Sequence, residues 1–450
     1  RSCPPPPSRT ISPYLPPPAM DAGGKEHRKT PWSRALRVCL PLLTIADVAL
    51  LAVAHASPGA ATEADGYAPL GMLKPHEVTR DNLFTAIHRL ASSGTWFMVF
   101  VVAIMSGLWP YVKLLGTLLV AMLADLRLLT VRTAHLWLTW LEACGKWSFA
   151  DVVLICLNYV LFKIETPEHS LGSFGNLKIS IYMSLKFGAL GLMLAIVFSM
   201  LITTWAKHEL ELQLEGPSRE PLVASGGRGP NSWFASPSAA GLVAFLGLAA
   251  AILVVVGSSL PTIHAVRYGF LANLMAPEDQ QIDLTLLKVV LGLDSAPISV
   301  LLSIIAFCVA FLAPLCEVLF LALSGVAANL GSGAFSYQTR MLAEWCSSFD
   351  CLDVFLIVSV IQMFETPKAV EFNVGSECTQ WKGFMNNKAM LSMVGLQSAA
   401  STECFGISST LAAGFWLLVA SVVLRFLAWR IVLRMPASVA AGPKDLEAKI

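Results

Sequence analysis

The chain has 450 residues, of which 55% are hydrophobic and only 14% are charged, and its mean hydropathy is +0.65. Water-soluble domains carry about 25% charged residues, so this composition excludes an ordinary soluble protein and predicts an integral membrane protein. The formal net charge of +1, with no basic recognition motif beside it, gives no reason to expect nucleic acid as a partner.

The N-terminal residues 1–37 are basic and rich in proline, and they predict a disordered tail. The apolar run that follows, 38–56, ends in the small residues of "AHA". Such an ending is compatible with a cleaved signal peptide and with a retained first span, and both interpretations stay open here.

Helices that cross a bilayer need about 20 apolar residues. Six runs satisfy this length, and two shorter runs, each with an aspartate near its start and Glu-Thr-Pro at its end, are expected to cross as well. In chain order the predicted spans are 38–56, 96–123, 149–164, 177–205, 241–263, 298–327, 351–364 and 410–433. The amphipathic, tryptophan-rich segment 126–147 is expected to lie along the membrane surface.

The spans fall into two groups of four with the same features in the same order. The second span of each group contains an internal proline, Pro110 or Pro314, and the third opens with an aspartate, Asp151 or Asp353. These pairs lie 204 (314 − 110) and 202 (353 − 151) positions apart. Because four is an even number, both groups enter the membrane from the same side, which also favours a retained first span.

This pattern predicts an all-α integral membrane protein with about eight transmembrane helices, arranged as two parallel four-helix repeats. The predicted units are the tail 1–37, a first four-span repeat 38–205, a cytosolic linker 206–240, a second four-span repeat 241–434 and a C-terminal tail 435–450. Lys and Arg cluster in the N-terminal tail and in the connections after the second, fourth and sixth spans, so both termini are expected in the cytosol. The membrane itself is not specified.

Each third span is expected to end at its Glu-Thr-Pro, with Glu165 and Glu365 at the span ends and proline stopping the helix. The long connection after the seventh span holds Cys378 and Cys404. An oxidising compartment on the non-cytosolic side would allow these cysteines to form a disulfide. Two unpaired thiols are an equally good interpretation, since spacing alone does not establish a disulfide.

Charged residues within spans are costly and therefore functional candidates. Asp151 and Asp353 are expected either to cap a helix or to bind a proton or substrate, with equal weight. Lys163 lies twelve residues after Asp151, about 18 Å along a helix, so it is expected to point outward or to meet Glu165.

Lys113 and Glu317 each follow a span proline by three residues and have opposite charges. We expect them to face a common cleft between the repeats, as transport-pathway residues, or else to make only local or interface contacts. The prolines free backbone carbonyls that must be satisfied inside the bundle.

No motif for catalysis occurs, since the sequence contains neither a nucleophile elbow nor a His-Glu-x-x-His motif, and no cysteines have the spacing of a zinc site. We therefore expect no enzyme activity, no cofactor and no bound metal.

Two stretches, "SGLWPYVKLL" and "LEACGKWSFADVVLI" with the later "LFKIE", resemble the paraquat-inducible protein A family of bacterial inner-membrane proteins. The matching residues are Trp109, Pro110, Lys113, Trp147, Ser148, Asp151, Val152 and Lys163, with Pro314, Asp353, Val354 and Phe355 in the second group. The cysteine-rich zinc ribbons typical of the family are missing, because neither 20–37 nor 206–237 contains a cysteine.

The resemblance implies two tandem four-span units that take part in lipid transport across an envelope, beside a periplasmic mammalian-cell-entry domain protein. It implies membrane lipids as the molecules moved and polar residues such as Asp151 and Lys163 in the pathway. The predicted function is thus a membrane component that moves a lipid or other amphiphile, and the alternative is a non-transporting scaffold or channel.

Overall fold

The computed structural model describes residues 34–67, 76–126, 128–166, 169–170, 176–214, 237–273, 275–293, 296–385 and 405–434. Its first half contains α1 (Arg34–Ala56), β1 (Ala60–Tyr67), β2 (His76–Asp81), α2 (Leu83–Ser92), α3 (Trp96–Phe100), η1 (Val101–Leu108), α4 (Trp109–Asp125), α5 (Val131–Gly145), η2 (Lys146–Phe149), α6 (Ala150–Leu161), β3 (Ile164–Glu165), β4 (His169–Ser170), β5 (Asn176–Leu185) and α7 (Phe187–Leu214).

The second half contains α8 (Pro237–Ser259), β6 (Pro261–Tyr268), α9 (Phe270–Asn273), α10 (Pro277–Gln280), β7 (Gln281–Thr285), α11 (Leu286–Leu291), α12 (Pro297–Phe307), η4 (Cys308–Leu312), α13 (Ala313–Asn329), α14 (Gly333–Phe349), α15 (Leu352–Met385), β8 (Gly406–Leu411) and α17 (Ala413–Val432). Helices α7 and α8 extend into the predicted linker 206–240, and residues 1–33, 215–236 and 435–450 lie outside the described residues.

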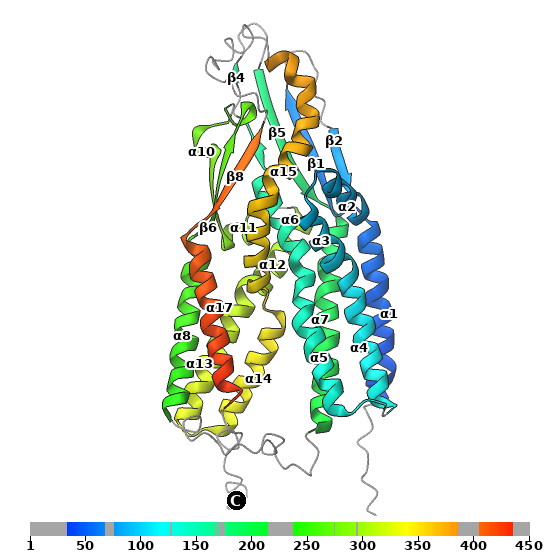
Figure 1. Cartoon of the computed structure of the whole chain (residues 1–450), viewed down its shortest axis with the longest axis vertical. Helices are drawn as coiled ribbons and strands as arrows, with labels where there is room; N and C mark the ends of the chain where they lie inside the picture. Colours follow the sequence, from blue (N-terminus) through cyan, green and yellow to red (C-terminus); the bar gives the residue numbers. More distant parts are fainter. Residues whose placement is uncertain are drawn as a thin grey trace, which may run out of the picture.

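Among the described residues, eight helical segments are long and apolar enough to cross a membrane, which confirms the predicted class. They are Arg37–Ala56, Trp96–Asp125, Val131–Leu161, Phe187–Leu210, Pro237–Ser259, Pro297–Asn329, Phe335–Lys368 and Ala413–Val432. The helices run roughly parallel, and the described chain begins and ends at the same end of the bundle (Figure 1). We call this end the terminal side.

Two antiparallel sheets lie at the opposite end, which we call the sheet side (Figure 1). One has the strand order β2-β1-β5-β3, with β4 also paired to β5, and the other has the order β7-β6-β8. In the first sheet Ala60 pairs with Leu185, and in the second Ile263 pairs with Leu411. In each half, the strand that follows the first span thus pairs with the strand that precedes the fourth span.

The sheets correct three span boundaries. The predicted spans 177–205 and 410–433 each begin inside a strand, β5 or β8, and 241–263 ends inside β6. Apolar strands that run directly into apolar helices read as one hydrophobic stretch, and periodicity does not separate them over a few residues.

The segment 126–147 does not lie along the membrane surface, so that prediction is wrong. Its helix α5 continues through the 3₁₀ turn η2 into α6, and together they form the third span, Val131–Leu161. Helix α5 packs on both α4 and α7, and these contacts give its polar face partners inside the bundle.

The two second spans contain π-helical segments, η1 and η4, directly before their prolines. Proline has no N–H and its ring clashes with the carbonyl four residues earlier, so a wider turn at this point relieves the clash. Pro110 and Pro314 then stand at the start of the regular helices α4 and α13.

One backbone carbonyl of the π segment η4 is satisfied from another span. The Cys351 N–H donates to the carbonyl of Val309 at 3.4 Å.

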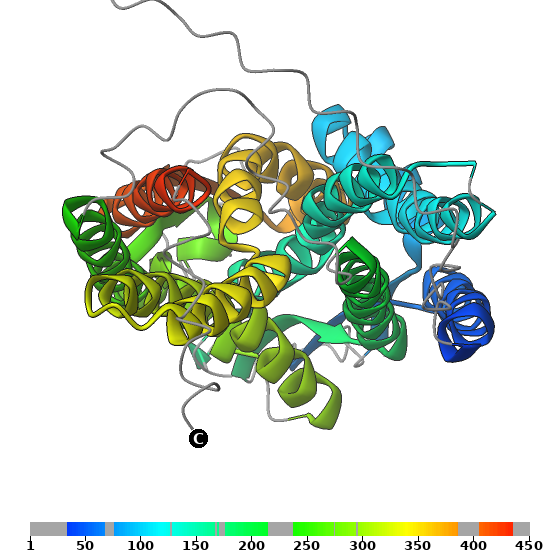
Figure 2. The ribbon, with the colours of Figure 1, turned by 90° about the horizontal axis from the view of Figure 1, so that it is seen from below.

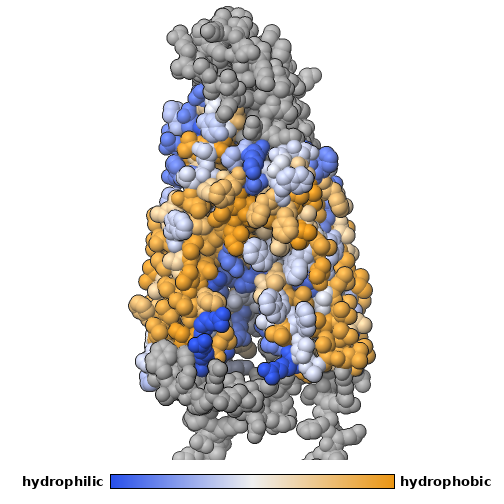
Figure 3. All heavy atoms as spheres, viewed as in Figure 1, coloured by the Kyte–Doolittle hydropathy of each residue, from blue (hydrophilic) through white to orange (hydrophobic). Residues whose placement is uncertain are grey.

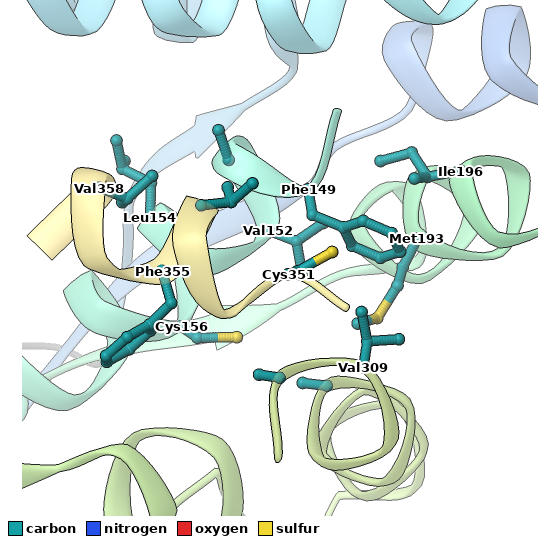
Figure 4. Packing of buried hydrophobic residues seen from close by; sticks show 14 of the residues in the cluster. Phe149, Val152, Leu154, Cys156, Met193, Ile196, Val309, Cys351, Phe355 and Val358 are labelled. Atoms are coloured by element: carbon teal, nitrogen blue, oxygen red, sulfur yellow. The ribbon is translucent and has the colours of Figure 1, made fainter. Parts of the chain in front are cut away.

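Seen from below, α1, α4, α5 and α7 group on one side and α8, α13, α14 and α17 on the other, with α15 between them (Figure 2). The halves meet through the third spans, where α6 packs on α15. Phe149, Val152 and Cys156 lie opposite Cys351 and Phe355, and this buried cluster joins the two halves (Figure 4).

Candidate functional site

Asp151 uses its carboxylate between helices rather than as a helix cap. It lies buried in the first turn of α6, whose N-cap residue is Phe149, and its Oδ2 accepts a hydrogen bond from Ser106 Oγ at 3.1 Å. Ser106 belongs to the π segment η1. Asp353, at the corresponding place in sequence, accepts instead from the backbone N–H of Val354 at 3.0 Å.

Lys113 is completely buried in the second span, and its Nζ donates to Ser199 Oγ of α7 at 3.2 Å. Gly145 of α5 leaves the space for this ammonium, because a Cβ there would lie 2.6 Å from Lys113 Nζ. Asp47 of the first span interacts electrostatically with Lys113, and within the described residues neither of its buried carboxylate oxygens accepts a hydrogen bond. Groups of this kind inside a span are functional candidates.

Glu317 is buried in α13 and binds the last span. Its Oε2 accepts from Arg425 Nη1 at 3.3 Å and its Oε1 from Trp429 Nε1 at 2.6 Å. The same Arg425 nitrogen contacts the carboxylate of buried Asp350, at the break between α14 and α15. Lys113 and Glu317 thus have partners within their own halves, and the structure does not bring them together.

Sequence reasoning missed Arg425 and Asp350. The sequence signal for Arg425 is a charged residue inside an apolar run. An arginine within a span needs an acidic partner, so this signal also predicts that one exists. Asp350 lies three residues before Asp353, and sequence alone does not show which of the two turns inward.

A second polar cluster joins the halves on the terminal side. Glu142 of α5 accepts from Lys207 Nζ at 2.8 Å and from Thr204 Oγ1 at 3.2 Å, both on α7. It also accepts a short hydrogen bond from Ser348 Oγ of α14, in the other half. Nearby, the rings of His208 and Trp345 meet edge to face with centroids 6.1 Å apart.

The space-filling view shows a hollow in the terminal-side part of the molecule, between the labelled α14 and α5 of Figure 1 (Figure 3). Hydrophilic residues gather at its sides, while hydrophobic residues cover the surface on either side at the same height. The two helices on either side of this hollow, α14 and α5, carry Ser348 and Glu142 of the cluster described above.

On the sheet side Arg267 of β6 connects the halves. Its Nη2 donates to the carbonyl oxygens of Leu161 and Lys163, both at 2.7 Å, at the end of α6. Burial lowers the pKa of this guanidinium to about 10, and nearby Asp279 acts against that effect, so the group stays cationic at neutral pH. Gln362 Nε2 of α15 also donates to Asn158 Oδ1 of α6.

The two Glu-Thr-Pro sequences differ in structure. At the first, α6 ends at Leu161, and Lys163 pairs with exposed Glu165 at 3.5 Å, as predicted. At the second, the prediction that proline ends the helix is wrong, because α15 continues through Pro367 to Met385. Proline removes one backbone donor from a helix interior, but here the helix continues through it.

Glu365 is buried and pairs with Lys368 at 3.1 Å. The possible disulfide between Cys378 and Cys404 falls outside the described residues. Within the described part of the chain, no group of three or more His, Cys, Asp or Glu side chains stands ready to hold a metal ion.

Eight apolar helices, buried charges between them and small sheets at one end define a multi-span integral membrane protein. The model of the family Paraquat-inducible protein A matches residues 40–211. This segment, which begins within the first span and ends in the last turn of α7, is therefore similar to the paraquat-inducible protein A family, as its motifs predicted. Comparison with curated proteins and with solved structures gave no match in either set.

Proposed function

We propose that the chain is the membrane component of a system that moves a lipid or another amphiphile. The observation that carries this proposal is the hollow between the halves, with hydrophilic sides at a height where the neighbouring surface is hydrophobic (Figure 3). Polar side chains cost free energy at membrane depth, so those that occur there are functional candidates. A hollow of this kind suits a molecule whose head group is polar and whose tails remain in the bilayer.

We further propose that the molecule consists of two equivalent four-span units. The strand orders β2-β1-β5 and β7-β6-β8 support this, as each unit places its strands in the same sequence after the first span and before the fourth. A π segment followed by proline in each second span supports it independently.

The sheets offer a surface outside the bilayer to a partner, for which we propose a mammalian-cell-entry domain protein or an equivalent lipid conduit. We also propose that the chain itself carries out no enzymatic reaction and that both termini lie in the cytosol. The alternative function, a non-transporting scaffold or channel, treats the buried charges as purely structural.

Reconstituted vesicles with a fluorescent phospholipid test the proposal. We expect Asp151→Asn and Lys163→Met to abolish lipid movement while both variants insert at the normal level. Asp125→Asn and Lys288→Met, which change charges outside the predicted transport-pathway residues, are matched controls expected to keep transport. The scaffold alternative is correct if the first two variants transport fully or if the wild type moves no lipid.

Mass spectrometry of lipids that copurify with the protein tests the class of substrate directly. The proposal expects a lipid retained through purification and depleted in Asp151→Asn. Wild-type protein that carries no lipid contradicts it.

A further inference from the structure

Arg267 closes the end of a helix that belongs to the other half of the molecule. The last carbonyls of a helix lack partners within it, and its C-terminus carries partial negative charge, so a cation there is favourable. Arg267 satisfies both conditions with its two 2.7 Å bonds to Leu161 and Lys163, and its residue surface is only 5% exposed.

The same guanidinium also holds its own half in place. Its Nη1 donates to the carbonyl of Asp279 in α10 at 3.2 Å, so three separate segments meet at one side chain. The acceptors on α6 lie 106 and 104 positions away in sequence. Charge-assisted hydrogen bonds are about twice as strong as neutral ones, and burial protects these from water and salt.

The contacts between the halves differ at the two ends of the bundle. On the sheet side they comprise the Arg267 bonds, the Gln362–Asn158 bond and the apolar cluster of the third spans. On the terminal side they comprise the Glu142–Ser348 bond and the His208–Trp345 contact. The hollow of Figure 3 lies between α14 and α5, the helices that carry Ser348 and Glu142. Side-chain contacts therefore join the halves on both sides, and the hollow between them lies in the terminal-side part of the molecule.

We propose that Arg267 is the latch that keeps the two halves closed on the sheet side, and that the structure shows the state open toward the terminal side. Releasing the Leu161 and Lys163 carbonyls lets the sheet-side ends of the halves separate and exposes the α6–α15 interface there. This inference deepens the proposed transport function, because it assigns the side from which an amphiphile enters and the contact that must break before it leaves.

Cys156 provides a reporter of this opening. It is buried on α6 between the halves, five residues before Leu161, or about 7.5 Å along the helix. A variant that keeps Cys156 and replaces the other nine of the ten cysteines is placed in vesicles, and a membrane-impermeant maleimide is added from the sheet side. We expect Arg267→Ala to raise the labelling rate at least about tenfold over the Arg267 protein, since it removes two charge-assisted bonds.

Two matched variants isolate the latch. Arg89→Ala removes another sheet-side arginine, which is ion-paired to Asp81 at 2.7 Å and lies on α2, a helix that packs on α1, α3 and η1. Ser348→Ala removes the side-chain hydrogen bond to Glu142, one of the contacts between the halves on the terminal side. Neither is expected to change sheet-side labelling of Cys156, whereas Arg267→Lys is expected to give an intermediate rate because lysine lacks the fork that holds two carbonyls.

Hydrogen–deuterium exchange of residues 157–163, measured in protein with all native cysteines, gives a second reading that cysteine replacement does not affect. Faster exchange in Arg267→Ala at an unchanged global melting temperature supports the latch. Unchanged labelling and exchange overturn it, and so does an equal rise in Arg89→Ala. Neither measurement requires a transported lipid. If both support the latch but the protein moves no lipid, the proposed function is contradicted and the latch is not.

Discussion

Lys113 depends on the absence of a side chain at position 145. A Cβ on Gly145 would lie 2.6 Å from Lys113 Nζ and 2.8 Å from Cε, distances that real contacts do not show. Lys113 is fully buried and its ammonium is held by Ser199, so the side chain has no room to move aside without losing that bond.

We predict that Gly145→Ala destabilises the protein by about 1–3 kcal/mol, the usual cost of overpacking a filled interior. Thermal unfolding in detergent measures the change. In a Lys113→Ala background the same glycine substitution should cost much less, because the clash partner is gone. An equal loss of stability in both backgrounds would show that the Lys113 side chain is not what requires glycine at position 145.

Glu63 of β1 makes a charge contact that is sensitive to acid. Its Oε1 accepts from Lys186 Nζ at 2.8 Å and from Ser184 of β5. The Lys186 and Ser184 hydrogen bonds hold the pKa of this carboxyl below its usual value of 4.5. A carboxyl whose pKa is lower in the folded state stabilises the fold above its unfolded pKa, and that stability is lost as pH falls through the folded pKa.

We therefore predict that Glu63→Gln lowers the melting temperature at pH 7, and that the gap to the wild type narrows as pH falls below about 4.5. Melting curves of both proteins over this pH range check it. Asp125→Asn, whose partner Arg37 lies on the terminal side, serves as the comparison for general acid effects. A gap that stays constant with pH would contradict the assignment.

At the scale of elements, the spans follow from sequence and the strands do not. A run of about 20 apolar residues has few outcomes other than a membrane helix, which is why six of the eight spans were predictable from length. The third and seventh, predicted as 149–164 and 351–364, begin earlier in the structure, at Val131 and Phe335. Strand β5, "NLKISIYMSL", is only ten residues long and continues after Lys186 into α7. Nothing in its pattern marks where the helical period begins, and its pairing with β1 depends on residues more than a hundred positions away.

The candidate site was predictable only in part for a related reason. Asp151 and Lys113 are recognisable in the sequence as charged residues within apolar runs, and both are buried in the structure. The partners of Lys113 and Glu317 were not predictable, because the helix phase that decides which neighbour each side chain meets depends on the π segments. Arg267 lies in a strand that the sequence did not reveal.

Helices α8 and α13 approach each other through glycines. A Cβ on Gly325 would lie 2.6 Å from the carbonyl oxygen of Ala240, and one on Gly247 would lie 2.8 Å from that of Val318. These atoms are backbone and cannot rotate away. Small residues of this kind let membrane helices pack backbone to backbone.

We predict that Gly325→Ala and Gly247→Ala each cost about 1–3 kcal/mol of stability, as the helices must separate to admit the methyl group. Thermal unfolding in detergent is again the measurement. Gly241→Ala, in α8 like Gly247, is the matched control, since the nearest atom to its Cβ is 3.6 Å away. Equal effects at positions 241, 247 and 325 would mean that helix propensity, not packing, governs the response.

At the scale of the molecule, the connections divide cleanly between two sides. The described chain begins and ends on the terminal side, and both sheets lie on the other (Figure 1). If the termini are cytosolic, as the distribution of basic residues predicts, then the sheets face the opposite compartment.

Accessible cysteines test this orientation in intact cells. We expect an impermeant maleimide to label Glu165→Cys, whose native side chain is 60% exposed on the sheet side, and not Leu330→Cys, which is 79% exposed on the terminal side. Permeabilised cells, in which both should react, provide the control. Labelling of position 330 alone in intact cells would reverse the orientation.

The π segments have a consequence for how the second spans tolerate a change of length. A π turn bonds five residues back rather than four, so it contains a residue that an α-helix of the same length does not need. Deleting Ile104 would restore the ordinary ladder and leave Lys113 facing α7, at the cost of bringing the Pro110 ring against the carbonyl of Ser106. Deleting a residue of α4 after Lys113 would instead turn the rest of that helix by about 100° and expose its buried face to lipid. Each second span thus has a place, next to its proline, where the deletion of one residue leaves the helical phase intact.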